Sequence, residues 1–152
     1  MNDELVTLVV DPASFRQSAR GTISGQIFIR MADGGFPMIG WSDVVLPVLA
    51  AWVRAFVAIE NGSSEERIYF MDGPYYVDVL AVSPQMLLMN LIEDREVDAS
   101  RREVRELAER FLHNLLKACD DVLAECERRG WRNDDVEDLL QLRSVLKENR
   151  GH

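Results

Sequence analysis

The chain has 152 residues, 47% of them hydrophobic and 28% charged, which suits one ordinary globular domain with a sizeable core. Acidic residues outnumber basic ones by 26 to 17, giving a net charge of −9, so the chain lacks the surplus of lysine and arginine that binding to nucleic-acid phosphates requires. The first residues do not join a basic stretch to an apolar run, so we expect no signal peptide and a cytoplasmic protein.

The first forty residues predict two strands and a loop. Glu4–Val10 is short and rich in β-branched residues, and Thr22–Met31 carries aliphatic residues at alternate positions, as a strand with one buried face does. Between them, an Asp-Pro pair is compatible with a short helix over Pro12–Ala19 or with a simple turn. Ala32–Gly40 contains Asp-Gly-Gly and Phe-Pro and is expected to form a loop.

The most apolar stretch is Val44–Ile59, in which Arg54 is the only charged residue. A helix that is apolar almost all the way round belongs inside a protein, so we predict a buried central helix with Ser42 as its N-cap. The stretch is shorter than the ~20 apolar residues that span a membrane, so no membrane segment is expected. Pro47 either kinks this helix or marks its regular start, and the second is favoured. The line of the helix predicted to face solvent consists of Pro47, Ala51, Arg54 and Ala58.

Three consecutive strands are predicted next, at Arg67–Asp72, Tyr75–Val82 and Met86–Ile92. The connections between them are short and contain Gly-Pro and Ser-Pro, which favours an antiparallel meander. Both faces of these strands carry apolar residues, so the sheet needs full cover on one face and partial cover on the other.

Asp98–Arg129 is predicted to be one long helix, because apolar residues recur every three or four positions along most of its length. Ser100 and Glu103 have the spacing of a capping box at its start. Gly130 is expected to end it.

A last helix is predicted from Asn133 or Asp134 to about Lys147. The fold class is therefore α+β, in the order β-β-α-β-β-β-α-α, and no linker or repeat divides the chain. We expect a single domain in which a five-stranded antiparallel sheet packs against the buried central helix and the long C-terminal helix, followed by the short last helix.

Side chains that carry catalysis or hold metal ions are scarce. The two histidines, His113 and His152, and the two cysteines are not spaced as zinc ligands, and no glycine-rich phosphate loop is present, so we expect no metal and no cofactor. Cys119 and Cys126 lie seven residues apart in the predicted helix, about 10 Å along its axis, which is too far for a disulfide. We therefore expect reduced, buried thiols and no catalytic residue.

Two groups of residues are candidates for contacts with a partner. Asp72, Tyr75 and Tyr76 lie at a predicted turn and strand start, although aspartate is also a favoured turn residue and tyrosine a favoured strand residue. An acidic cluster after the last predicted strand can dock a basic surface or simply be a solvated connection. Its members are Glu93, Asp94, Glu96 and Asp98.

Part of the chain resembles a known class of proteins. Trp41 and Asp43 at a helix start, a later Trp52, and a strand that ends in Phe70–Tyr75 look like small immunity proteins of bacterial polymorphic and contact-dependent toxin systems. The resemblance covers about Phe36–Tyr76, roughly a quarter of the chain. It implies an acidic α+β cytoplasmic domain that binds and neutralises a cognate toxin, and it assigns no functional residues.

The leading hypothesis is therefore a non-enzymatic, stoichiometric inhibitor whose acidic surface meets a basic toxin, such as a nuclease. Two alternatives remain open. A homo-oligomeric scaffold or regulatory adaptor, in its simplest form a homodimer, would use the apolar sheet face. A small-molecule enzyme or binder would have its pocket near Trp41, Asp72, Tyr75 and Tyr76.

Overall fold

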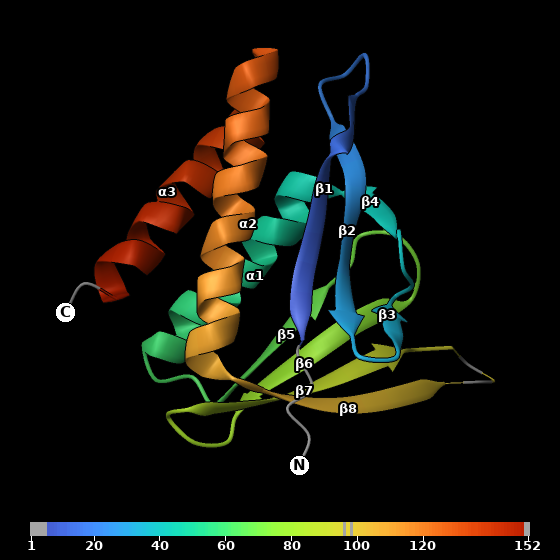
Figure 1. The fold of residues 1–152 in the computed structure, drawn as a ribbon, viewed down its shortest axis with the longest axis vertical. Helices are drawn as coiled ribbons and strands as arrows, with labels where there is room; N and C mark the ends of the chain where they lie inside the picture. The colour runs from blue at the N-terminus through green and yellow to red at the C-terminus, as the bar shows by residue number, and fades with distance from the viewer. Residues whose placement is uncertain (1–5, 96, 98, 151–152) are drawn as a thin grey trace.

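The computed structural model describes residues 6–95, 97 and 99–150, which form three helices and two four-stranded antiparallel sheets (Figure 1). The α+β class is confirmed, whereas the predicted single five-stranded sheet is wrong. The helices are α1 (Val45–Glu60), α2 (Ala108–Arg129) and α3 (Asp134–Arg150). The first sheet contains β1 (Thr7–Gln17), β2 (Ile23–Met31), β3 (Gly34–Phe36) and β4 (Ser42–Val44). The second sheet, in spatial order, contains β5 (Glu65–Tyr69), β6 (Tyr75–Ala81), β7 (Met86–Glu93) and β8 (Ser100–Leu107).

The first sheet is built on a long hairpin of β1 and β2. The short helix expected over Pro12–Ala19 does not form, and the chain does not simply turn there, because β1 continues through this segment with a register irregularity after Asp11. At the irregularity the Ser14 hydroxyl replaces part of the strand pairing: it donates to the Asp11 carbonyl at 2.6 Å and accepts from the Gln26 amide at 2.8 Å. The predicted loop over 32–40 also holds β3, which pairs with β2.

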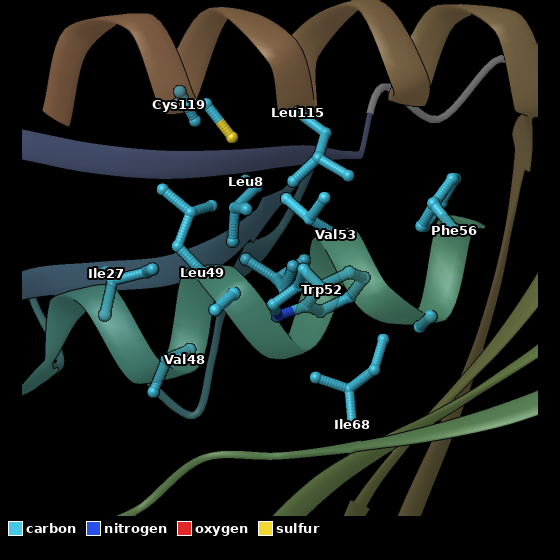
Figure 2. Packing of buried hydrophobic residues seen from close by; sticks show 14 of the residues in the cluster. Leu8, Ile27, Val48, Leu49, Trp52, Val53, Phe56, Ile68, Leu115 and Cys119 are labelled. Atoms are coloured by element: carbon cyan, nitrogen blue, oxygen red, sulfur yellow. The ribbon is translucent and has the colours of Figure 1, made fainter. Parts of the chain in front are cut away.

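The predicted central helix is confirmed as α1. It lies with the second sheet on one side and with β1, β2 and α2 on the other (Figure 2). Trp52 is fully buried, and its ring centroid is 5.3 Å from that of Phe111 on α2, on which Phe56 also stacks at 5.5 Å. Leu8 from β1 and Ile68 from β5 close on the same helix from opposite sides (Figure 2). Both sheets therefore share one core, and α1 is its centre.

The predicted start of α1 is corrected by the structure. Ser42 belongs to β4 rather than acting as an N-cap, and the residue before the helix, Val44, makes no side-chain cap hydrogen bond. The helix begins at Val45 and runs through Pro47, which is its third residue and not its regular start. Proline fits there because the first backbone N–H groups of any helix lack an intrahelical acceptor. On the line expected to face solvent, Arg54 is exposed and forms an ion pair with Asp138 of α3 at 2.6 Å.

The largest correction concerns the beginning of the predicted long helix. Ser100–Leu107 is strand β8, which pairs along the whole of β7, so Ser100 and Glu103 form no capping box and the helix begins only at Ala108. Burial within β8 alternates, since Val104 packs into the core while its neighbours on either side are exposed. Strand β8 forms because the backbone N–H and C=O groups at the edge of β7 need hydrogen-bond partners, which a helix at this position would not supply.

The two C-terminal helices otherwise follow the sequence pattern. Gly130 ends α2 with φ of +71°, the left-handed conformation that favours glycine. Asn133 caps α3 by accepting the Val136 amide at 2.9 Å, and α3 runs to Arg150, beyond the predicted end at Lys147. Within the described ranges no helix is both long and apolar enough to cross a membrane.

The end of α2 is tied to the first sheet by charged side chains. Glu125 accepts hydrogen bonds from Arg128 and Arg129, and these bonds lower the pKa of its carboxyl to about 2. Arg129 also donates to the backbone carbonyls of Phe15 at 3.0 Å and Pro12 at 3.3 Å. The helix end and the irregular part of β1 are therefore held together through one guanidinium.

Candidate functional site

A buried carboxylate joins the start of α1 to the turn between β5 and β6. Asp43 is 6% exposed, and one of its oxygens accepts the amide of Val44 at 2.7 Å. Its other oxygen accepts the indole N–H of Trp41 at 3.1 Å and the amides of Met71 and Asp72 at 3.1 and 3.2 Å. Asp43 and Met71 are 28 residues apart in sequence, so this carboxylate fixes a distant turn against the first sheet.

Aromatic rings pack around the same turn. The ring centroid of Tyr75 lies 5.1 Å from that of Trp41 and 5.7 Å from that of Phe36, both in edge-to-face contacts. Gly73 has φ of +75°, and a Cβ added to it would lie 2.8 Å from the Tyr75 ring, so the turn requires glycine. Apart from Trp52 in the core, the residues that carry the family resemblance thus form one local junction with a structural role.

Four of the seven candidate contact residues come together beside this junction. Tyr75 is paired with Glu93 across β6 and β7, and the Asp94 amide donates to the carbonyl of the residue before Tyr75 at 2.8 Å. Asp72 is exposed in the turn itself. Glu93 forms an ion pair with Arg95, whose guanidinium also reaches the Tyr75 hydroxyl at 3.5 Å. The two groups of candidates, far apart in sequence, therefore share one end of the second sheet.

Tyr76 is placed differently from its neighbour Tyr75. Adjacent residues of a strand point to opposite faces of the sheet, so Tyr76 lies on the face away from α1. There its ring centroid is 5.5 Å from that of Tyr69 and 4.1 Å from the guanidinium carbon of Arg67. The remaining two candidates, which lie outside the described residues, are Glu96 and Asp98.

Large exposed hydrophobic side chains occur in the loops next to the end of the sheet where the four candidates meet. Met38 and Ile39, in the loop that leads to Trp41, are 53% and 55% exposed, and Met71, next to Asp72, is 52% exposed. Val97, in the connection that follows β7, is 93% exposed. We define the loop end as the surface formed by Met38, Ile39, Met71, Asp72, Asp94 and Val97. Sequence reasoning missed its apolar members, because an apolar residue in a loop can equally fold back into the core.

Two cavities lie in the described part of the chain close to the second sheet. The smaller, of about 370 Å³, is lined by Ser24, Ser42, Asp43, Val44, Met71 and Asp72. Of the residues expected around a small-molecule pocket, its lining includes Asp72 but not Trp41, Tyr75 or Tyr76. The larger, of about 690 Å³, lies at the opposite end of β6 and β7, where the end of α1 faces the start of α2, and Phe56, Leu87 and Leu112 contribute to its apolar lining.

Neither a metal-binding cluster nor a reactive thiolate is found among the described residues. Among the residues that the structure describes, no three or more His, Cys, Asp or Glu side chains are grouped so that they could hold a metal ion. Both cysteines are buried and free of disulfides, as predicted. Burial raises the pKa of the Cys119 thiol to about 12 and also raises that of Cys126, so neither is the thiolate that a nucleophile requires.

No protein-family model, no curated protein and no solved structure matches this chain. The resemblance to immunity proteins therefore has no support from these comparisons. A function for this chain is therefore inferred from the geometry of the loop end and of the second sheet.

Proposed function

We propose that this chain is a non-enzymatic, immunity-type protein that binds and neutralises a basic protein toxin in the cytoplasm through the loop end. One observation carries the proposal. Of the eight large hydrophobic side chains that are exposed in the described part of the chain, four belong to the loop end, which also carries the carboxylates of Asp72 and Asp94. Exposed apolar groups gathered at one place on a molecule are typical of a contact surface.

The chemistry of the loop end suits a protein partner of positive charge. Methionine is one of the residue types enriched in protein interfaces, and carboxylates around an apolar centre steer a basic partner and set its orientation. Two nearby carboxylates are already paired within the chain, Asp33 with Arg102 and Glu93 with Arg95. Within the described residues no ion pair is found for Asp72 or Asp94. These two carboxylates can therefore pair with lysine or arginine side chains of a partner.

The loop end is also held in a fixed shape before any partner binds. The Asp43 carboxylate bonds the backbone of Met71 and Asp72, and the Tyr75 ring packs against Trp41 at the end of the neighbouring loop. Binding to a preformed surface avoids most of the entropy cost of ordering loops. A preformed surface suits inhibition by simple occlusion of the partner.

Co-expression with the product of the neighbouring gene tests the proposal. That product should be toxic alone, harmless together with this chain, and recovered with it as a complex. Asp94→Lys should weaken the complex about tenfold, because it places a like charge against a basic partner. Glu148→Lys is the matched control, since it reverses one exposed charge at the end of α3, away from the loop end, and should leave the affinity unchanged.

Three results would contradict the proposal. The neighbouring product could be harmless by itself, or no complex could survive purification. Asp94→Lys and Glu148→Lys could also weaken the complex equally, in which case only the net charge of the chain would matter and the loop end would not be the contact surface.

A further inference from the structure

The second sheet has one face against α1 and an opposite face that no described helix or strand covers (Figure 1). We define this outer face by the strand residues that point away from α1. Half of them are apolar or aromatic: Tyr69, Tyr76, Leu80, Met86, Leu88, Ile92 and Leu107. The others are charged or carry an amide: Glu65, Arg67, Asp78, Asn90, Arg101, Glu103 and Arg105.

The charges of the outer face cancel, although the chain as a whole carries −9. Three arginines stand against three carboxylates, so two copies of the chain would repel one another less at this face than at an acidic one. A neutral, half-apolar face on a strongly acidic molecule is therefore suited to self-association. It is less suited than the loop end to a basic partner, because it carries as many positive as negative groups.

The charges are also arranged in opposite order on the two edge strands. The register places Glu65 of β5 in the same cross-strand row as Arg105 of β8. The next row runs from Arg67 of β5 to Glu103 of β8. In both of these rows the two edges thus carry opposite charges, with β6 and β7 between them, whereas the third row runs from Tyr69 to Arg101.

From this arrangement we propose that two copies of the chain pack their outer faces together about a two-fold axis that runs parallel to the strands, between β6 and β7. Such an axis places β5 of one copy over β8 of the other and keeps each row opposite itself. Glu65 then faces Arg105 of the second copy, Arg67 faces Glu103, and Leu80 faces Leu88. Sheets packed in this way cross at about −30°, so residues near the centre of the face stay closest to register and those on the edge strands shift most.

The side chains at the centre of the outer face are ordered in the single chain. The Arg67 guanidinium bonds both carboxylate oxygens of Asp78, at 2.7 and 3.1 Å, and lies over the Tyr76 ring. Hydrogen bonds to Asp78 raise the pKa of Arg67 further above its ordinary value. Arg101 donates to the side-chain oxygen of Asn90 at 3.2 Å. Ordered tyrosine and arginine side chains lose little entropy on association and often dominate the binding energy of interfaces.

The size of the face sets the expected strength of the dimer. Four strands spaced about 4.8 Å apart, each about seven residues long, present a face of roughly 19 by 23 Å. Its fourteen residues fall below the roughly 20–30 per partner of a standard stable interface. We therefore expect a reversible dimer with a dissociation constant in the micromolar range. This inference does not depend on the proposed toxin partner, because the loop end lies outside the packed faces.

Sedimentation equilibrium over about 1 μM to 1 mM of the full chain tests the dimer. The average mass should rise from that of one chain toward that of two. Leu88→Glu should weaken the dimer at least tenfold, because it would bury a carboxylate against an apolar side chain. Leu140→Glu is the matched control, since Leu140 is an exposed leucine on α3 and its replacement should leave the dimer unchanged.

A charge exchange tests the proposed axis directly. Arg105→Glu should weaken the dimer about tenfold, because it would place two carboxylates opposite each other. The double variant Glu65→Arg/Arg105→Glu restores opposite charges across the axis and should recover wild-type dimerisation. It would not recover dimerisation if Arg105 only stabilised the fold of the single chain. A chain that stays monomeric throughout, equal weakening by Leu140→Glu, or a double variant no better than Arg105→Glu would each overturn the proposal. Asp94→Lys, which tests the toxin-binding surface, should leave the dimer intact. A failure of the toxin hypothesis can therefore be told apart from a failure of the dimer proposal.

Discussion

Replacing Asp43 by alanine should destabilise the fold, because its carboxylate joins the start of α1 to the turn between β5 and β6. In the variant Asp43→Ala four N–H groups lose their acceptor: the amides of Val44, Met71 and Asp72 and the indole of Trp41. A hydrogen bond to a charged group contributes about 1.5–3 kcal/mol, so a full loss would approach about 10 kcal/mol. The hollow beside Met71 and Asp72 admits water to part of this junction, which lowers the expected cost to about 4 kcal/mol.

Urea unfolding followed by tryptophan fluorescence measures this cost. With an m-value of about 2 kcal/mol per molar, 4 kcal/mol moves the midpoint down by about 2 M. Asp43→Asn keeps one acceptor oxygen and should lose roughly half as much, so the prediction stays measurable if the alanine variant does not fold. Asp72→Ala is the control: its side chain is exposed in the same turn, and its midpoint should hardly change. A midpoint for Asp43→Ala within about 0.5 M of wild type would refute the view that this carboxylate holds the turn.

Three further predictions concern other parts of the chain. Gly73→Ala should destabilise the fold by about 2 kcal/mol or more, because the added Cβ would meet the Tyr75 ring. Gly130 has nearly the same φ but open space around it, so Gly130→Ala should cost only the backbone strain of about 1 kcal/mol. Urea unfolding of the two variants measures this difference in stability. The carboxyl of Glu125, whose pKa two arginines of α2 lower to about 2, should stabilise the fold at neutral pH and stop doing so as the pH falls from about 4.5 toward 2. The stability gap between wild type and Glu125→Gln should therefore be largest at pH 7 and close by about pH 2, and a gap independent of pH would contradict this. Cys119 and Cys126 should react with a thiol reagent only as fast as the protein opens, so labelling of the native chain at the rate of the unfolded chain would show that they are not buried.

Hydrophobic pattern alone located most of the elements. The apolar run over Val44–Ile59 predicted a buried helix, and α1 covers that run from Val45 and ends one residue after it, although its predicted N-cap and its favoured start at Pro47 were wrong. The alternation in Thr22–Met31 and the glycine at 130 likewise predicted β2 and the end of α2. These signals are local, because they arise from side-chain periodicity and from the backbone conformations that glycine allows.

The wrong predictions concern segments in which pairing with a neighbouring strand outweighs the local sequence pattern. Ser100–Leu107 has a helical spacing of charges and a cap-like start, yet it forms β8 because the edge of β7 offers a full row of unpaired backbone groups. The segment after Asp11 extends β1 for the same reason, since β2 is long enough to pair with it. Neither outcome is visible in a window of neighbouring residues, because each depends on which strand lies alongside.

The candidate site shows the same division. The amino-acid pattern predicted an acidic chain with buried cysteines, a central apolar helix and two separate groups of candidate contact residues. The folded arrangement was needed to show that Asp72 and Asp94 share one end of a sheet, that Tyr75 and Tyr76 lie on opposite faces, and that Asp43 joins the turn to the first sheet. The physical reason is that composition and periodicity are properties of short segments, whereas a surface or a buried hydrogen-bond network exists only once distant backbone groups have chosen their partners.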